Sequence, residues 1–229
     1  MIISRTPFRI SFFGGGTDHL DYFSQYPGMV LSTSINKYCY ISISKSPLFS
    51  NYKYQVSWSE IEKVNSLDEI KHPTIKNSLK FLNFKEGLSI FHRGDLPARS
   101  GMGSSSSFTV ALLNGLKYLQ GNKSNNKHEL AIQAQYIEST LNKEKVGFQD
   151  QFASSFGGLN QINFNYIDNK PIIDVKNVSI SNDFKNELET SLILCYLNSH
   201  RNASVIEEAK FENKVNSISI LNDIKDLIK

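Results

Sequence analysis

The sequence predicts a mixed fold in which strands and helices share a globular core. Residues 2–13 show β-like alternation, and residues 29–43 are rich in β-branched and aromatic side chains, as in strands. In residues 104–119, by contrast, apolar side chains recur at three- and four-residue spacing, which is typical of a helix. Hydrophobic residues make up 40% of the 229 residues, enough for a packed core.

Composition and charge argue against some classes of binding partner for this protein. The formal charge of +3 arises from 25 basic and 22 acidic residues without a basic block, so we expect neither nucleic acid nor a membrane as partner. Cys39 and Cys195 show no metal-ligand spacing, which favours reduced thiols and a cytoplasmic location. Arg5 and Arg9 interrupt the N-terminal apolar run, and no long apolar segment follows, so we expect no signal peptide or membrane span.

The first predicted strand, 2–13, ends in a tight turn at Gly14, Gly15 and Gly16. Thr17 and Asp18 follow the turn, and they could equally cap the next turn or contact a ligand. Arg9 lies within the apolar strand, so its guanidinium needs a partner, either a structural carboxylate or a phosphate in transfer.

The next elements lead to a glycine-rich loop. After the strand at 29–43, a short strand is predicted near Val56 and a helix over 68–84, with Pro73 near its first turn. Residues 88–92 are strand-like and feed directly into the loop.

The glycine- and serine-rich run that precedes the helix at 104–119 predicts a phosphate site. Gly101 and Gly103 free the backbone to fold around an anion, and Ser104 to Ser107 bring hydroxyls and unpaired N–H groups to the positive end of the helix. Such a run taken alone could be a flexible linker, but the helix that follows it, with Gly121 at its C-terminal end, favours the phosphate site. It is not a P-loop, because it contains no lysine.

Two carboxylates stand out in the following helices. Glu138 lies at the edge of an apolar stripe over 130–141, where it could reach a site or form a surface salt bridge. Asp150 lies in the first turn of a short helix that starts near Gln149, where an isolated aspartate ordinarily stabilises the helix dipole. Further elements are predicted along the remaining chain: strands at 159–164, up to 175 and at 191–197, a helix at 183–189, and helices within 201–229.

Four segments together resemble the sugar-kinase branch of the GHMP kinases: FRISFFGGGTD, DLPARSGMGSSSSFTVALLN, IESTLNKEKVGFQDQFASSFGG and YLNSHRNAS. The resemblance implies an α+β fold, with an N-terminal domain like the second domain of ribosomal protein S5 over residues 1–170. An incomplete ferredoxin-like C-terminal domain is expected over residues 171–229, with the active site in the cleft between the two. ATP and Mg²⁺ also follow from the resemblance.

The resemblance also assigns roles to residues of this sequence. The loop that wraps the ATP phosphates would comprise Gly101, Met102, Gly103, Ser104, Ser105 and Ser106, and the magnesium ligands would be Ser105 and Glu138. Asp150 would be the catalytic base, and Arg9 would lie near the phosphate in transfer. The sugar contacts would come from Gly15, Gly16, Thr17 and Asp18. These parts suit phosphoryl transfer, which requires charge neutralisation, a hard cation and an oriented hydroxyl.

The activity implied is ATP-dependent phosphorylation of a sugar or sugar phosphate, above all at the anomeric hydroxyl of D-glycero-D-manno-heptose 7-phosphate. Galactose or fucose is the near alternative, and a homodimer is an open expectation. The chain ends before the later glycine-rich motif of the family. A second hypothesis is therefore a truncated homologue that binds nucleotide or sugar without turnover.

Overall fold

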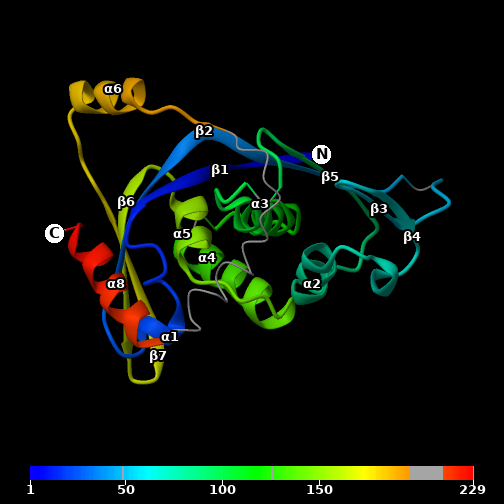
Figure 1. The fold of residues 1–229 in the computed structure, drawn as a ribbon. Helices are drawn as coiled ribbons and strands as arrows, with labels where there is room; N and C mark the ends of the chain where they lie inside the picture. Colours follow the sequence, from blue (N-terminus) through cyan, green and yellow to red (C-terminus); the bar gives the residue numbers. More distant parts are fainter. Residues whose placement is uncertain (48, 99, 125, 196–213, 229) are drawn as a thin grey trace.

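The computed structural model describes all residues except 48, 99, 125, 196–213 and 229, and it centres on one seven-stranded sheet (Figure 1). The strands are β1 Ile2–Phe13, β2 Gly28–Lys45, β3 Tyr54–Ser57, β4 Ile61–Val64, β5 Leu88–Gly94, β6 Leu159–Ile167 and β7 Lys170–Asn177. The helices are α1 Leu20–Phe23, α2 Pro73–Phe81, α3 Ser104–Leu119, α4 Lys127–Tyr136, α5 Gln149–Phe156, α6 Asn182–Ser191 and α8 Lys214–Asp226. A 3-10 turn covers Leu67–Glu69, and a π-helical turn, Ile137–Leu141, extends α4.

Strand β2 is the central strand of the sheet and pairs with three others. The strand order is β4-β3-β5-β2-β6-β7, and β1 also pairs with β2. β1 pairs with β2 in antiparallel register from Ile2 opposite Ile43 to Phe13 opposite Leu31. The other edge of β2 pairs with β5 at one end and with β6 at the other. Both ends of β2 are therefore paired on each edge of the strand.

Helices α3 and α5 pack on β1 and β2, and α4 packs against both of them as an outer layer (Figure 1). One side of α3 contributes Phe108, Leu112 and Leu116 to the core that includes the sheet residues Ile41 and Ile90. The opposite side packs against α4 and its π-helical extension through Val110 and Leu113. Because both faces are apolar, α3 is buried over most of its length, and its N-terminal end is fixed relative to the sheet.

The register between β1 and β2 shifts between Pro7 and Arg9, where the pairing advances by two residues on β1 and by four on β2. Proline cannot donate to the ladder, and irregular pairing of this kind is common beside functional sites. The backbone N–H of Arg9 donates to the carbonyl of Met102 at 3.2 Å, and this bond ties β1 to the loop before α3.

The part that follows β6 contains the expected domain boundary and a predicted strand. β7 pairs with β6 along its whole length and so extends the sheet beyond residue 170, and the domain boundary expected there stays a prediction. The prediction of a strand at 191–197 is wrong for its described part, because Ser191 ends α6 and residues 192–195 are neither helix nor strand. Residues 196 and 197 lie outside the described residues, and the ferredoxin-like arrangement stays a prediction.

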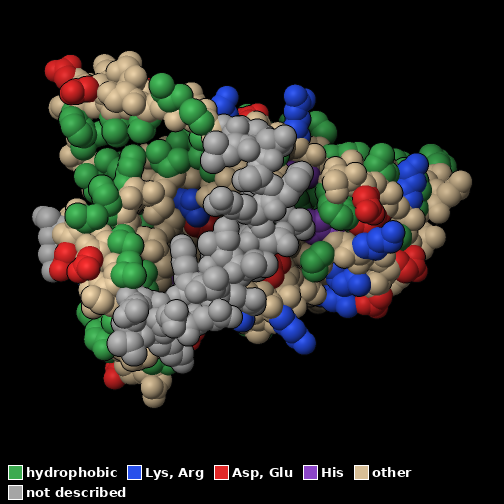
Figure 2. Space-filling view, in the orientation of Figure 1, with side chains coloured by type: hydrophobic (Ala, Val, Ile, Leu, Met, Phe, Trp, Pro, Cys, Tyr) green, Lys and Arg blue, Asp and Glu red, His purple; other side chains and the backbone are tan. Residues whose placement is uncertain are grey.

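Helix α6 has no buried residue and projects from the sheet, whereas α8 lies beside α1 (Figure 1). The hydroxyl of Tyr22 in α1 donates to Asn222 at 2.6 Å, and Lys225 donates to the carbonyl of Pro27 at 3.1 Å. Hydrophobic side chains gather on the surface between α6 and α8, whereas charged side chains of both signs intersperse over the β3–β4 end (Figure 2). Within the described ranges, no helix has the length and apolar character needed to cross a bilayer.

Candidate active site

A cavity of about 190 Å³ opens where the end of β1, the glycine turn and the start of α5 meet. Its lining residues are Arg9, Ser11, Gly15, Gly16, Asp18, His19, Ser106, Val146, Gly147, Gln149, Asp150 and Gln151. They come from three separate parts of the chain, residues 9–19, Ser106 and residues 146–151, which the packing of α3 and α5 on β1 brings together. The lining combines polar side chains of opposite charge with backbone that glycine leaves open, as expected of a site for a polar ligand.

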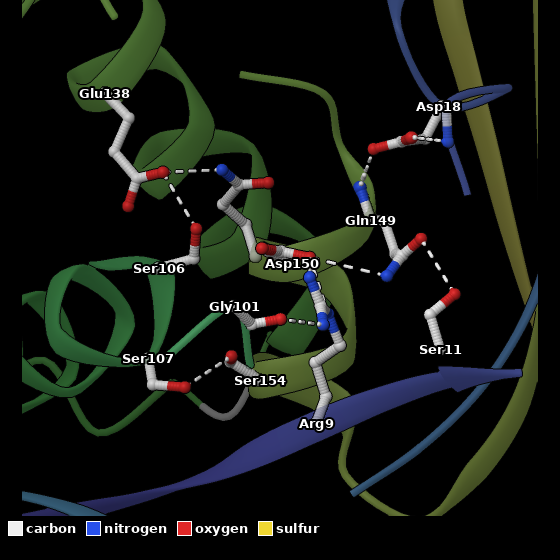
Figure 3. A network of polar contacts seen from close by, with 12 residues as sticks. Arg9, Ser11, Asp18, Gly101, Ser106, Ser107, Glu138, Gln149, Asp150 and Ser154 are labelled. Carbon is white, nitrogen blue, oxygen red and sulfur yellow. Dashed lines mark hydrogen bonds and ion pairs between the residues drawn. The ribbon is translucent and has the colours of Figure 1, made fainter. Parts of the chain in front are cut away.

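Arg9 and Asp150 form an ion pair at the cavity wall (Figure 3). The Nε of Arg9 donates to Asp150 Oδ1 at 2.7 Å, and Nη2 lies 2.6 Å from the same oxygen. A third donor, Nη1, reaches the carbonyl of Gly101 at 3.1 Å. The guanidinium therefore connects the strand, α5 and the glycine-rich loop, and its rigid planar geometry suits bridging of this kind.

The glycine-rich loop leads into helix α3, whose N-terminal end has no side-chain cap. Gly103 occupies the N-cap of α3 with φ of +70°, a left-handed conformation that glycine adopts without strain. The first N–H groups of a helix have no intrahelical acceptor and carry partial positive charge. A Cβ on Gly103 would lie 3.2 Å from the Arg9 side chain, so the loop and the ion pair are in close contact.

Glu138 lies behind the cavity wall, where its side chain is completely buried. Ser106 and Gln151 both donate to its Oε2, at 2.8 and 2.6 Å. Burial raises the pKa of Glu138 to about 7, although these two donors and the nearby Thr109 hydroxyl lower it. Its Oε1 is buried and accepts no hydrogen bond within the described part, and the Thr109 hydroxyl donates to the Ser105 carbonyl at 3.1 Å.

Asp18 connects the glycine turn to α5. Its Oδ1 accepts from the N–H of Gly16 at 3.1 Å, and its Oδ2 accepts from the N–H of Gln149 at 3.0 Å (Figure 3). The backbone of Phe148 also donates to the carbonyl of Asp18 at 3.2 Å. Asp18 therefore fixes the N-terminal end of the helix that carries Asp150, and it does not cap α1.

The structure gathers most of the predicted residues around this cavity. Arg9, Gly15, Gly16, Asp18, Ser106 and Asp150 line it, and Gly101 and Gly103 contact Arg9. Thr17 does not line it: the residue is fully buried, its hydroxyl lies within donating distance of the carbonyls of Gly14 and Met29, and it accepts from the N–H of Met29. Ser105 is exposed, and the serine in contact with Glu138 is Ser106.

Two further residues at the site, Gln149 and Gln151, were not singled out from the sequence. Both are buried on α5 and flank Asp150, and Gln149 accepts a hydrogen bond from Ser11 at 3.3 Å. The sequence signal for them is weak, because α5 also contains Ser154 and Ser155, and only their burial in the structure shows that the two amides need partners.

Comparisons with known proteins show similarity to one family of kinases. Residues 70–158 match the family model described as GHMP kinases N terminal domain. The chain is 31% identical over 219 residues to a D-glycero-alpha-D-manno-heptose 7-phosphate kinase from Campylobacter jejuni, an alignment that covers 91% of this chain and 63% of that protein.

Solved structures share the fold. A D-glycero-D-manno-heptose 1-phosphate kinase from Bacteroides thetaiotaomicron superposes with a TM-score of 0.74 at 25% identity, covering 83% of this chain and 64% of that one. A mevalonate kinase from Methanococcus jannaschii gives a TM-score of 0.67 at 17% identity, covering 99% and 71%, and this likeness shows the fold alone. The chain thus spans somewhat under two thirds of the length of the two heptose kinases it resembles.

Proposed function

We propose that the chain belongs to an ATP-dependent sugar kinase, because residues 70–158 match the GHMP kinases N-terminal domain and the mixed α/β fold resembles that of a heptose 1-phosphate kinase. The preferred acceptor is the anomeric hydroxyl of D-glycero-D-manno-heptose 7-phosphate, in line with the name of the relative at 31% identity. Galactose and fucose are the alternative acceptors.

The observation that carries the proposal is the meeting of three features at one cavity. The Arg9–Asp150 ion pair forms its wall, the uncapped N-terminus of α3 lies directly beside that pair, and the buried Glu138 lies behind Ser106. A phosphoryl donor needs positive charge at its oxygens, and an acceptor hydroxyl needs a carboxylate close by. The arrangement supplies both within one small volume.

The chain's own residues take these roles in the proposal. The N–H groups at the start of α3 bind phosphate oxygens, and Arg9 neutralises charge on the group in transfer. Asp150 orients the acceptor hydroxyl and accepts its proton, while Arg9 and the helix hold the carboxylate in place. Asp18 and the glycine turn shape the opposite wall, where the sugar would lie.

The residues near Glu138 fit a magnesium ion. Mg²⁺ prefers oxygen ligands and is usually held by one or two carboxylates plus substrate phosphates. Glu138 offers a buried oxygen with no hydrogen-bond partner within the described residues, and the neighbouring hydroxyl of Ser106 is a second oxygen donor. Among those residues, no group of three or more His, Cys, Asp or Glu side chains is arranged to hold a metal. A bound Mg²⁺ would neutralise charge on the β/γ oxygens of ATP.

Two measurements test the proposal. ADP release is followed over a panel of heptose 7-phosphate, galactose and fucose, and we expect turnover that depends on the sugar. Calorimetry with Glu138→Gln should show weaker Mg-ATP binding and a smaller change for ATP without metal, because an anionic ligand becomes a neutral amide. Glu86→Gln, the same change at an exposed ion pair with Lys45, is the control. ATP binding without ADP release for any sugar would favour the binding-only alternative, and equal Mg-ATP affinities would remove Glu138 from the metal site.

A further inference from the structure

Gln151 is a buried polar residue of α5, and the proposed kinase function assigns it no role. Its side chain is 0% exposed although it lines the cavity. Its Nε2 donates to Glu138 Oε2 at 2.6 Å, and its Oε1 has no hydrogen-bond partner within the described residues. A buried amide oxygen without a partner is costly, and it marks either strain or a ligand site.

The donors around Glu138 restrain its carboxylate. Ser106 and Gln151 both donate to Oε2, from α3 and from α5, so the two contacts approach from different elements. A carboxylate held at one oxygen by two donors is restricted in rotation, and the other oxygen then points in a fixed direction. That other oxygen, Oε1, is the one without a partner.

The two unpaired oxygens belong to side chains that contact each other. Glu138 Oε1 and Gln151 Oε1 are both buried, and an N–H···O bond joins the opposite ends of the two groups. Ser106 and Gln151 line the cavity, whereas Glu138 lies behind them. Gln151 therefore stands between the carboxylate and the space that a ligand would enter.

We propose that Gln151 is a positioning residue for the cation: its amide N–H orients Glu138 so that Oε1 faces Mg²⁺, and its own Oε1 accepts a hydrogen bond from a water molecule on the ion. The proposal rests on the proposed kinase function. Mg²⁺ retains several of its waters when bound, and these waters require acceptors. Groups that orient a metal ligand typically change metal affinity by about 10- to 100-fold when they are removed.

The first variant is Gln151→Met, which keeps the length of the side chain and removes both polar atoms. The second is Gln151→Asn, which keeps the amide but is one methylene shorter, so that it no longer reaches Glu138. Binding of Mn²⁺ as the metal probe is measured by electron paramagnetic resonance with a non-hydrolysable ATP analogue, and analogue binding without metal by calorimetry. Gln133→Met, on α4 and away from the cavity, is the matched control.

We expect both variants to weaken Mn²⁺ binding by about 10- to 100-fold and metal-free analogue binding by less than about 3-fold. The control should match the parent. A purely structural role would lower the melting temperature and weaken both kinds of binding equally, and that outcome overturns the proposal. Unchanged Mn²⁺ affinity in either folded variant also overturns it.

The remaining outcomes are distinguishable as well. If the parent binds the analogue without any dependence on metal, the proposed function fails with this inference. If the parent shows metal-dependent binding and the variants match it, only this inference fails. Should both variants fail to fold, the side-chain amide NMR signal of Gln151 in the parent decides. It should shift when metal is added to the analogue complex, and a signal that does not move contradicts the proposal.

Discussion

Arg9 and Asp150, 141 residues apart, meet through a single carboxylate oxygen: Nε and Nη2 of the guanidinium lie 2.7 and 2.6 Å from Asp150 Oδ1. The second oxygen, Oδ2, is not used by the arginine, and it faces Gly103, where an added Cβ would lie 3.4 Å away. One oxygen of the carboxylate is therefore anchored, and the other is directed towards the start of α3.

Asp150→Asn should lower kcat by about 100-fold or more and leave the affinities for sugar and Mg-ATP largely intact, because the amide keeps the shape of the side chain but cannot accept the proton. Steady-state kinetics and calorimetry on the same preparations measure both quantities. Asp174→Asn, an exposed residue of β7, is the matched control. A normal kcat with a raised KM would make Asp150 a binding residue only.

Asp18→Asn should lower the free energy of unfolding by about 1–3 kcal/mol, because the buried carboxylate accepts two backbone N–H groups and an amide presents N–H to one of them. Denaturant unfolding gives the value. Asp21→Asn, an exposed residue of α1, should change stability little. If Asp18→Asn weakened sugar binding at unchanged stability, the residue would be a ligand contact and not an organiser of the cavity.

Gly101→Ala and Gly103→Ala separate backbone strain from steric contact. Both residues have positive φ, +74° and +70°, so each substitution should cost about 1–2 kcal/mol of stability. Of the two, the new Cβ at Gly103 would contact Arg9 and Asp150, whereas a Cβ at Gly101 meets no atom of the described residues within 4 Å. We expect the larger loss of turnover for Gly103→Ala, and equal losses would show that the ion pair tolerates the displacement.

Protonation of His72 in mild acid should destabilise the fold. Its ring stacks on Phe108 and contacts Trp58, and burial lowers its pKa from 6.5 to about 4. The unfolded chain then binds the proton more readily, so stability is fully present above pH 6.5 and falls as the pH drops towards 4. In His72→Gln, the free energy of unfolding, measured by denaturant unfolding at several pH values, should change less over this range, by an amount on the order of 1–3 kcal/mol. Identical pH profiles would contradict the effect.

Local periodicity in the sequence was enough to predict the elements that build the site. Residues 104–119, with their helical apolar spacing, form the buried helix α3. The segments predicted as strands, 2–13 and 29–43, lie in the paired strands β1 and β2. These predictions succeed because a face that must be buried repeats with the period of its own secondary structure. Where the apolar run is short, as at 191–197, the pattern does not distinguish a strand from an irregular segment, and that prediction was wrong in its described part.

By itself, the sequence determined the mixed fold and the local chemistry: the open helix end after Gly103, the polar turn before Asp18, and carboxylates at Glu138 and Asp150. Only the tertiary structure decided how these groups pair. It joined Arg9 to Asp150, placed Ser106 and not Ser105 against Glu138, and enclosed Thr17. The physical reason is that burial and partner choice depend on contacts between segments far apart in sequence, whereas turn conformations and helix ends depend on neighbouring residues.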